Sequence, residues 1–562
     1  MISRRGESGE VARYPLAFAP EESIQLGSDY GATMGMSPDG KALAYVGVGP
    51  TKVKQVFVRA VSDLRARAIA GTDGATQAFY SPDGKWIGFV ANQKLQKVPV
   101  DGGTATVIAD IGSSVRGVSW GSNDQIVIAA TRLFVVPSGG GVRRPIVRVD
   151  SATVGGSQAW PFALPDGNTV LYTIWHGSLA SARIGVANIE GGKTTELDLP
   201  GTAPLGVIEG RLIYVGPAGT LMAVPFDVRR ARLAGAPTAM SDQVLVAPNG
   251  GVNASLSQGG SLVYQAGPSA QQLVLASGAA EPRVLISDPR LYSTPRFSPD
   301  GKRVAVTSAS GASQDIWICD IAARAFTKLT TEGNNDRPEW SPDGKRVIYR
   351  SSRAGKLFTI WWQTADGGTP AEPLVRASAI DVAEAVLSRD GRTVVYRTGS
   401  AGTADLWYRR VEGDTTPKPI ATTKFTETAV RISPDGQWVA YVSDESGQLQ
   451  VYVVPFPGPG VRYQVTIDGG SSPVWSPDGR HLLYVYAGKV MAATRSPGPA
   501  FAVASRELRQ DGEWSIAGGG HAGFDVSPDG KDLLLVRSVG GNVQTIVALN
   551  WRAEVRARAA MK

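Results

Sequence analysis

A short turn sequence recurs along the whole chain of 562 residues and limits how it can fold. The tetrapeptide Ser-Pro-Asp-Gly occurs at residues 37–40, 81–84, 298–301, 341–344, 433–436, 476–479 and 527–530. Weaker or degenerate copies stand at residues 122–124, 164–167, 208–210, 258–260 and 388–391. Proline presets φ and Asp-Gly supports a tight reversal. The turns divide the chain into twelve repeats of about 45 residues.

Each repeat has the same order of short apolar stretches around its turn. One such stretch precedes the turn, a second follows it, a third is aromatic, as in Asp315–Ile318, and a fourth is short, as in Phe326–Leu329. Four antiparallel strands in 40–45 residues are typical of one propeller blade. The sequence therefore predicts an all-β fold of four-stranded antiparallel blades, with helix only from Arg552 to Met561.

The spacing of the turns predicts how the blades divide between domains. The two longest intervals, 50 and 51 residues, separate repeats five and six and repeats eleven and twelve. A block of six repeats has therefore been duplicated, which favours two tandem six-bladed β-propellers. The expected domains are an N-terminal flexible segment at 1–12, propeller 1 at 13–287, propeller 2 at 288–551 and a C-terminal tail at 552–562.

Strand counting also predicts how a ring closes. The twelfth repeat offers three strands, at 523–527, 532–537 and 543–550, whereas the sixth has its own fourth strand at 282–286. An extra strand at 13–18 precedes the first repeat. Because rings avoid open edges by sharing strands, we expect the 13–18 strand to complete a blade, most simply the twelfth. The alternative is that it serves the first propeller alone.

Composition excludes several classes of function. The single Cys319 forms no internal disulfide, and three scattered histidines (His176, His481, His521) do not suit a metal site. No apolar run reaches the length of a membrane helix, and the polar N-terminus is not that of a signal peptide. The net charge of +7 is not concentrated in a patch. We expect no cofactor, no metal, no nucleic-acid partner and no membrane span.

Ser-Pro-Asp-Gly-Lys followed by an aliphatic and aromatic strand resembles the repeat of TolB-like propellers. Longer strings, at 441–447, 454–460 and 547–551, resemble the propeller sensor half of bacterial serine/threonine protein kinases. That resemblance implies a periplasmic or extracytoplasmic location and a sensing or scaffolding role. A cytoplasmic location is expected instead if the chain is complete, because it shows no signal or anchor. No His-Arg-Asp or Asp-Phe-Gly triplet occurs, so kinase activity is not implied.

Three further sequence features bear on whether the chain has a catalytic, nucleotide-binding or calcium site. The Gly-x-Ser-x-Gly elbow of propeller-associated peptidases does not occur. The stretch Gly518–Gly523 matches GxGxxG, but a strand follows it where dinucleotide binding needs a helix. The aspartates of the turns lack calcium-loop spacing, and we expect them to accept backbone N–H bonds. Cys319 and most tryptophans are expected in the core.

The loops that lead into the innermost strands are the expected place for a ligand site. The candidate residues there are Arg116, Trp160, Tyr292, Asp336, Arg337, Glu384, Glu427 and His521. We expect a non-enzymatic protein, a monomer or part of a larger assembly, that binds a protein, peptide or glycan at the channel mouths. The alternative is a carbohydrate-active lyase or hydrolase with an acid/base pair at a channel mouth.

Overall fold

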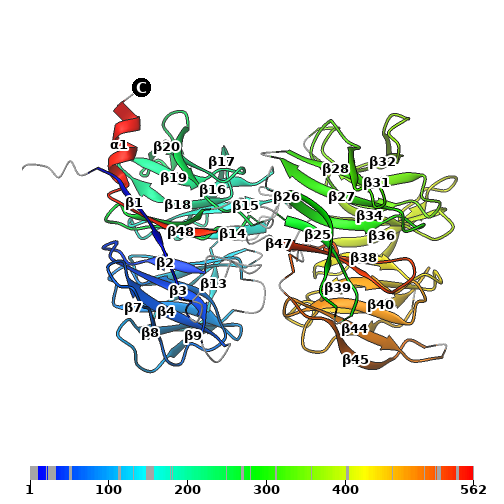
Figure 1. The fold of residues 1–562 in the computed structure, drawn as a ribbon, viewed down its shortest axis with the longest axis horizontal. Helices are drawn as coiled ribbons and strands as arrows, with labels where there is room; N and C mark the ends of the chain where they lie inside the picture. Colours follow the sequence, from blue (N-terminus) through cyan, green and yellow to red (C-terminus); the bar gives the residue numbers. More distant parts are fainter. Residues whose placement is uncertain are drawn as a thin grey trace, which may run out of the picture. The chain divides into compact units, whose positions relative to one another are not determined.

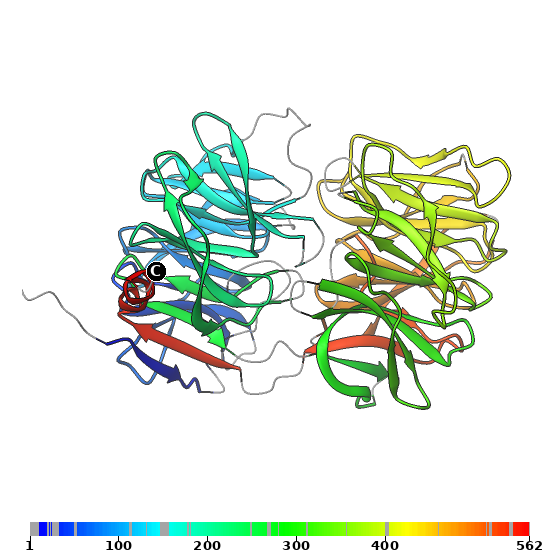
Figure 2. The same cartoon turned by 90° about the horizontal axis from the view of Figure 1, so that it is seen from above.

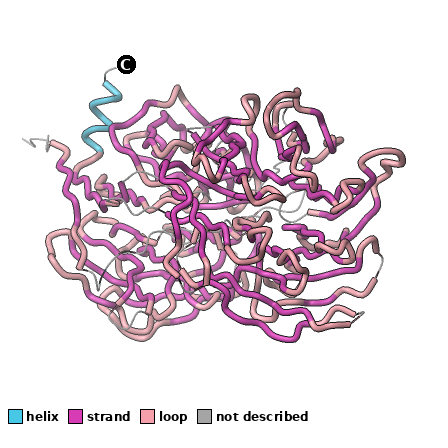
Figure 3. Tube along the Cα trace, turned by 45° about the vertical axis from the view of Figure 1, so that its right-hand side comes forward, coloured by secondary structure: helices cyan, strands magenta, loops and turns pink. Residues whose placement is uncertain are grey.

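The computed structural model consists mainly of β-sheets, and the one α-helix among the described residues, α1 (Arg552–Ala560), lies near the C-terminal end of the chain (Figure 3). The chain divides into two compact units: unit 1 holds Met1–Pro268 and Gly541–Lys562, and unit 2 holds Ser269–Gly540. The structure describes residues 10–19, 22, 24, 33–49, 53–111, 115–130, 132–146, 157–176, 179, 181–247, 250–266, 271–278, 280–310, 313–355, 357–399, 404–458, 460–498, 500–512, 514–515, 520–538 and 543–560. The N-terminal segment expected to be flexible lies mostly outside these residues.

Five sheets of unit 1 follow the chain in order, each antiparallel. The first is β2 (Met34–Met36), β3 (Ala42–Val48), β4 (Lys54–Ala60) and β5 (Arg67–Ala68), and the second is β6 (Ala75–Tyr80), β7 (Trp86–Ala91), β8 (Lys94–Pro99) and β9 (Thr106–Asp110). The third is β10 (Val118–Trp120), β11 (Gln125–Ala129), β12 (Leu133–Pro137) and β13 (Arg144–Pro145). The fourth is β14 (Ser157–Ala163), β15 (Thr169–Trp175), β16 (Arg183–Asn188) and β17 (Thr194–Pro200). The fifth is β18 (Ala203–Ile208), β19 (Arg211–Val215) and β20 (Thr220–Asp227), with β21 (Arg232–Leu233) and β22 (Thr238–Gln243) both paired to β20.

The sixth sheet of unit 1 joins three distant parts of the chain. Its order is β23 (Ala254–Leu256), β24 (Leu262–Ala266), β48 (Gln544–Leu549) and β1 (Ala12–Leu16). Figure 1 shows the red strand β48 beside the blue strand β1. The N-terminal strand pairs with the third strand of the twelfth repeat, but the sheet also contains two strands of the sixth repeat and belongs to unit 1. The strand therefore completes a sheet of the first unit, and the other strands of the twelfth repeat lie in unit 2 without it.

Unit 2 begins and ends in one seven-stranded sheet. Its order is β29 (Ala325–Lys328), β28 (Ser313–Asp320), β27 (Arg303–Ser310), β26 (Arg283–Phe297), β25 (Gln271–Ala276), β47 (Leu533–Ser538) and β46 (Asp525–Val526). The 15-residue strand β26 pairs with β25 through its first half and with β27 through its second half. It therefore serves two four-stranded groups, which we call the first (β26–β29) and the sixth (β46, β47, β25, β26) sheets of unit 2.

The other four sheets of unit 2 are regular. The second is β30 (Asn335–Trp340), β31 (Arg346–Ser351), β32 (Thr359–Thr364) and β33 (Glu372–Val375), and the third is β34 (Val382–Leu387), β35 (Thr393–Thr398), β36 (Asp405–Arg410) and β37 (Lys418–Ala421). The fourth is β38 (Glu427–Ile432), β39 (Trp438–Ser443), β40 (Gln450–Pro455) and β41 (Tyr463–Gln464). The fifth is β42 (Ser471–Trp475), β43 (His481–Tyr486), β44 (Lys489–Arg495) and β45 (Val503–Gln510).

The division between the units differs from the boundary expected near residue 287. That position lies inside β26, which runs unbroken from Arg283 to Phe297. The sixth repeat keeps β23 and β24 in unit 1 and places its third strand, β25, in unit 2; the twelfth repeat keeps β46 and β47 in unit 2 and places β48 in unit 1. Figure 2 shows one red strand in each unit. The chain therefore passes between the units twice, and the sixth sheet is built from three separate chain segments in unit 1 and from two in unit 2.

In each unit the innermost strands contact one another in cyclic order. In unit 1, β2, β6, β10, β14, β18 and β23 each touch the next, and β23 touches β2. In unit 2 the same holds for β26, β30, β34, β38, β42 and β46, with β46 touching β26. Four-stranded antiparallel sheets arranged in this way are consistent with propeller blades.

The repeated turns explain part of this order. As predicted, the turn aspartate accepts backbone N–H bonds: Asp39 Oδ1 lies 3.0 Å from Lys41 N and 2.6 Å from Ser37 Oγ, and other copies repeat this pattern. The turn glycine adopts positive φ, for example 69° at Gly301. A Cβ on Gly301 would lie 3.5 Å from the ring of Pro528 in the preceding turn of the cycle, so successive turns pack against one another.

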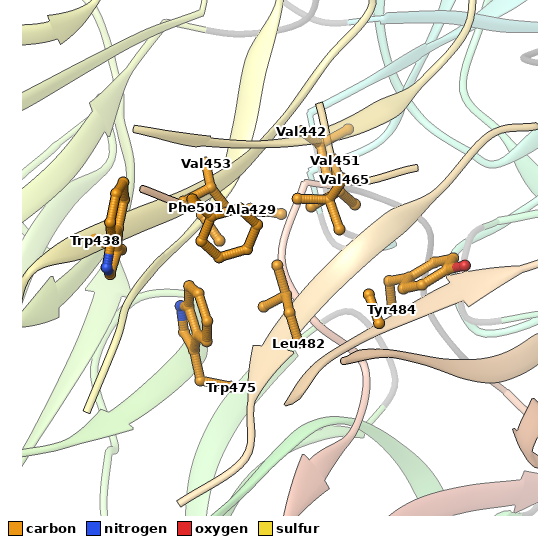
Figure 4. Packing of buried hydrophobic residues seen from close by; sticks show 12 residues of the cluster. Ala429, Trp438, Val442, Val451, Val453, Val465, Trp475, Leu482, Tyr484 and Phe501 are labelled. Carbon is orange, nitrogen blue, oxygen red and sulfur yellow. The ribbon is translucent and has the colours of Figure 1, made fainter. Parts of the chain in front are cut away.

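Apolar side chains fill the space between neighbouring sheets. Figure 4 shows Trp438 of the fourth sheet of unit 2 facing Trp475 and Phe501 of the fifth. Trp438 and Phe501 pack edge to face, with their ring centroids 5.5 Å apart. Cys319 is fully buried in the cluster between the sixth and first sheets, as predicted for a core residue, and burial raises the pKa of its thiol to about 12.

Candidate functional site

One position in each repeat, five residues before the last residue of its turn, lies at the centre of its unit. In unit 1 this position is occupied by uncharged residues, all of which line one cavity: Gly35, Phe79, Ser119, Phe162, Leu205 and Ser255. In unit 2 four of the six are charged: Arg296, Glu339, Val386, Arg431, Val474 and Asp525. The equivalent inner-strand positions are therefore uncharged in unit 1 and mostly charged in unit 2.

The centre of unit 1 contains a cavity of about 230 Å³. None of the described residues that line it carries a charge. Its aromatic side chains are Phe79, Tyr80, Trp120, Trp160 and Phe162. Its lining extends to the turns at the far ends of the inner strands, where Pro38, Pro82, Ser122, Pro165 and Ser257 contribute. Sites that bind small molecules or peptide segments are typically concave and mostly apolar in this way.

A loop from the sixth sheet reaches over the opposite end of this cavity. Val246 and Val252 pair as an isolated bridge, and Gly250 lies between them. A Cβ on Gly250 would lie 2.6 Å from Cζ3 of Trp175 and 2.9 Å from Cη2 of Trp160, both in the fourth sheet. Since the fifth sheet stands between the sixth and the fourth in the cycle, the loop crosses the mouth at the strand-start end.

The structure brings together the two candidate residues of unit 1. Arg116 Cζ lies 5.8 Å from the ring centroid of Trp160 and 5.7 Å from that of Trp175, within reach of cation–π attraction. Arg116 also donates a hydrogen bond of 2.8 Å to Ser157 Oγ. Trp160 is buried at a bulge with φ of 44°, and its indole Nε1 has no hydrogen-bond partner among the described residues. Trp160 thus lines the cavity, and Arg116 packs behind it.

The centre of unit 2 is filled by ion pairs. Arg296 Nε donates a hydrogen bond of 2.7 Å to Glu339 Oε1, and its other nitrogens donate to the backbone carbonyls of Pro295, Ala522 and Phe524. Arg431 Nη2 lies 2.9 Å from the same Glu339 oxygen. These side chains come from the first, second and fourth sheets, so they converge on the middle of the cycle.

His521 extends this network toward the strand-start end. Its Nδ1 lies 3.0 Å from Glu384 Oε2 and its Nε2 lies 3.2 Å from Glu339 Oε1, although the second contact is not aligned as a hydrogen bond. Burial and the nearby Arg431 and Arg296 lower the pKa of His521. His521 precedes β46, and the described residues 520–524 form no helix, so His521 enters the centre of unit 2 from a segment that leads into a strand.

Two cross-strand ion pairs lie beside His521. Arg350 donates to Asp336 at 2.7 Å and 2.5 Å, and Arg397 Nε donates to Glu384 Oε1 at 2.9 Å. Burial raises the pKa of a carboxyl group, whereas a nearby positive charge lowers it. The effect of Arg350 on Asp336 and that of Arg397 on Glu384 are larger than the effect of burial, so the pKa values of both acids lie below their usual range. Asp336, Arg337, Glu384 and His521, four of the eight candidates, therefore form one buried cluster.

Two candidates lie apart from this cluster. Tyr292 is buried in the apolar contact between the sixth and first sheets of unit 2, stacked on Phe326 with ring centroids 5.7 Å apart. Glu427 begins β38 and is fully buried, with Oε1 accepting a hydrogen bond of 2.6 Å from Thr423. Burial raises the pKa of Glu427 to about 7; the Thr423 hydroxyl opposes this shift and the Asp405 carboxylate adds to it.

Sequence reasoning missed the inner-strand position that lines both centres. Arg296, Glu339, Arg431 and Asp525 were not among the candidates, which were sought only in loops. The signal was present, because the residue five places before the last residue of each turn is a fixed register position. Among the described residues no group of three or more His, Cys, Asp or Glu side chains is arranged to hold a metal ion. No helix in the described part of the chain has the length and apolarity to span a membrane.

Comparison with known proteins identifies the repeats. Residues 268–417 match the family described as the TolB beta propeller domain. This part of the chain is similar to TolB-like β-propeller repeats. It is 30% identical over 197 residues to the Tol-Pal system protein TolB of Francisella tularensis subsp. holarctica, a match that covers 33% of this chain and 44% of that protein. The chain thus spans less than half the length of this TolB relative.

Solved structures include similar TolB proteins. A putative TolB from Agrobacterium tumefaciens matches 49% of this chain and 100% of its own, at 19% identity and a TM-score of 0.40. TolB from Acinetobacter baumannii matches 60% of this chain and 78% of its own, at 15% identity and a TM-score of 0.33. The TolB-like sequence match falls almost entirely in unit 2, whereas the uncharged cavity lies in unit 1.

Proposed function

We propose that each unit is a six-bladed β-propeller and that the chain is a non-enzymatic binding protein whose ligand site is the central channel of unit 1. The cyclic contacts of six innermost strands in each unit support the blade number. Turn glycines at the joints of both cycles pack on the neighbouring turn, Gly40 on Ser257 in unit 1 and Gly301 on Pro528 in unit 2, which supports closure. A ring that presents a different side chain from each blade can shape one specific site.

The uncharged cavity at the centre of unit 1 carries this proposal. A ligand that enters it loses water without meeting a charged partner, so a charged ligand group would be buried unpaired at high cost. Aromatic and proline side chains on the wall favour an uncharged, extended segment that packs its apolar side chains against them. We propose a peptide segment of a partner protein as the ligand, inserted from the turn end.

The centre of unit 2 supports the non-enzymatic part of the proposal. A general acid or base must come within hydrogen-bond reach of the substrate. Glu384 is 1% exposed and is hydrogen-bonded to Arg397 and His521, and Glu339 lies among Arg296, Arg431 and His521. These two carboxylates stabilise the ring, and we propose that neither acts on a glycan.

The location and wider context are proposals from resemblance. We propose that the chain works outside the cytoplasmic membrane, as TolB-like repeats imply, and that it serves as a sensor or scaffold module. The link to kinase sensor halves stays a prediction that rests on the strings at 441–447, 454–460 and 547–551.

A charge placed in the channel tests the function. Ser255 Oγ accepts a hydrogen bond of 3.0 Å from Met36 N, and in unit 2 the equivalent Asp525 accepts one of 2.8 Å from Phe297 N. Ser255→Asp therefore keeps a geometry that the fold already uses, and Ser255→Asn is the uncharged control. The probe is a peptide selected from a random display library on the intact chain, with its Kd measured by fluorescence anisotropy.

We expect Ser255→Asp to weaken peptide binding at least about tenfold and Ser255→Asn to stay within about threefold of wild type. If Ser255→Asp and wild type bind the peptide with equal affinity, the channel is not the binding site. Binding of a neutral oligosaccharide from a glycan array in place of any peptide would overturn the peptide assignment. Release of shortened glycan would overturn the non-enzymatic assignment.

A further inference from the structure

Two serine hydroxyl groups on the wall of the unit 1 cavity have a hydrogen to donate. Ser119 Oγ accepts a hydrogen bond of 3.0 Å from Ala163 N. Ser255 Oγ accepts one of 3.0 Å from Met36 N. Both serines are half-buried, and neither hydroxyl donates a hydrogen bond to any residue that the structure describes. Each hydroxyl group therefore has its hydrogen available for a ligand in the cavity.

The two donors lie on opposite sides of the cavity. Ser119 belongs to β10 in the third sheet and Ser255 belongs to β23 in the sixth, so they stand three places apart in the cycle of six innermost strands. A ligand that runs along the cavity therefore meets a donor on each side. Such a ligand must present acceptors, such as carbonyl oxygens, in more than one direction.

The six innermost strands of unit 1, as the structure describes them, are poor edges for the addition of a β-strand. β2, β10 and β23 are three residues long, and β6, β14 and β18 each contain a register shift. Strand addition needs a run of free backbone N–H and C=O groups along one edge. The N–H groups of Met36 on β2 and Ala163 on β14 are already bonded to the two serines. The wall therefore favours a ligand that makes separate hydrogen bonds through its carbonyl groups.

Aromatic side chains from three sheets line the same cavity. Phe79 on β6, Trp120 on β10 and Phe162 on β14 are half-buried, so part of each side chain stays accessible. The rings of Phe79 and Trp120 pack edge to face, with their centroids 6.4 Å apart. Proline-rich segments dock into grooves with aromatic walls, because their pyrrolidine rings pack against the aromatic side chains. The wall of the cavity therefore combines an apolar surface for proline rings with hydroxyl donors for carbonyl oxygens.

The polyproline II conformation suits such a wall. It has about three residues per turn and no internal hydrogen bonds, so its carbonyl groups are free and point in several directions around the axis. A proline carries no backbone N–H, so a proline-rich segment brings few donors that must find an acceptor inside the cavity. The conformation is also preformed, which reduces the entropy lost on binding.

We propose that the channel of unit 1 binds a proline-rich segment of a partner protein in the polyproline II conformation. Carbonyl oxygens of this segment accept hydrogen bonds from the hydroxyl groups of Ser119 and Ser255. This inference rests on the proposed function, because it names the class of peptide that the same channel takes. It adds a conformation and two hydrogen bonds that the proposed function does not require.

The test measures binding of fluorescein-labelled decaproline to the full chain by fluorescence anisotropy. A peptide of the same length with alternating serine and valine is the control ligand, because it is uncharged but favours a β-strand. We expect decaproline to bind with a Kd below about 100 μM and the control peptide to bind at least about tenfold more weakly. Decaproline should also displace the peptides selected from the display library, since both occupy one channel.

Ser119→Ala removes one of the two donors without adding a charge. We expect this variant to bind decaproline at least about fivefold more weakly than wild type, and Ser119→Thr, which restores a hydroxyl, to lose less affinity. If Ser119→Ala fails to fold, Ser255→Ala gives the same test from the opposite side of the cavity. Ser62→Ala, at an exposed serine in the turn after β4, is the matched control and should bind decaproline as wild type does.

The outcomes separate this inference from the function on which it rests. If the selected peptides bind but decaproline neither binds up to about 1 mM nor displaces them, the proline-rich class is wrong and the channel is still a peptide site. Equal binding of decaproline to wild type, Ser119→Ala and Ser255→Ala would also overturn the inference, as would tighter binding of the serine–valine peptide. If neither decaproline nor any selected peptide binds, the inference and the proposed function are both wrong.

Discussion

Arg13 and Asp242 form a two-bond ion pair that fastens the N-terminal strand of unit 1, with Nε to Oδ1 and Nη2 to Oδ2 both at 2.8 Å. Asp242 also accepts hydrogen bonds from the Tyr264 hydroxyl at 2.7 Å and from the Trp551 indole at 2.9 Å. Burial raises the pKa of Asp242, but these donors outweigh it and the pKa lies below its usual value. One buried carboxylate thus joins both ends of the chain to unit 1.

Replacement of Asp242 should therefore destabilise unit 1. We expect Asp242→Asn to lower the free energy of unfolding by about 3 kcal/mol, because it removes the buried carboxylate that pairs with Arg13 and accepts from Tyr264 and Trp551, and leaves Arg13 only its contact with Glu554. Urea unfolding followed by far-UV circular dichroism measures this change. Asp227→Asn is the control, since the Arg230–Asp227 contact of 3.5 Å is exposed at the arginine, and it should cost less than about 0.5 kcal/mol. Equal effects of the two variants would contradict the role given to Asp242.

Gly250 should tolerate no side chain. Its Cβ would lie 2.6 Å from Trp175 and 2.9 Å from Trp160, so Gly250→Ala must push the loop off the two tryptophans. We expect a loss of about 2 kcal/mol and stronger quenching of tryptophan fluorescence by acrylamide. Gly210→Ala shares the positive φ but meets nothing within 4 Å, so it should cost about 1 kcal/mol and leave quenching unchanged. Unchanged quenching in Gly250→Ala would show that the loop does not cover these rings.

Glu427 should make unit 2 less stable as pH rises. Its pKa in the folded chain, about 7, exceeds the ordinary value of 4.5, so the folded state holds the proton more tightly. Stability from this group is complete below about pH 4.5 and is lost as pH rises through 7. We expect Glu427→Gln to match wild type at pH 4.5 and to exceed it by about 2 kcal/mol at pH 8. Glu507→Gln, on the exposed strand β45, should show no such pH dependence. A constant difference across this pH range would refute the assignment.

Cys319 should be unreactive in the folded chain. It is fully buried, and burial raises the pKa of its thiol to about 12, so almost no thiolate is present at pH 8. We expect labelling by a thiol-specific disulfide reagent to be at least about a hundredfold slower in native protein than in denaturant. Fast labelling of the native chain would mean that the contact between the sixth and first sheets opens readily.

Much of the fold could be predicted from local sequence. Ser-Pro-Asp-Gly carries its own turn chemistry, since Asp39 accepts the N–H of Lys41 two residues along the chain. The alternation of apolar residues predicted the positions of the strands that flank each turn, including β46, β47 and β48 of the last repeat. The channel residues were missed because the search followed loops, whereas Arg296 and Ser255 reach the centre from inside strands.

The sequence by itself determined the twelve turns, the strand pattern, the all-β class and the burial of Cys319, because each depends on contacts between residues near in the chain or on simple apolar alternation. Only the tertiary structure decided that β25 joins β47 and β48 joins β24. These third strands, Gln271–Ala276 and Gln544–Leu549, have similar apolar patterns, and backbone hydrogen bonds do not distinguish them. Tertiary structure also decided that one centre is an uncharged cavity and the other a buried network of charges, because six distant repeats must meet before either exists.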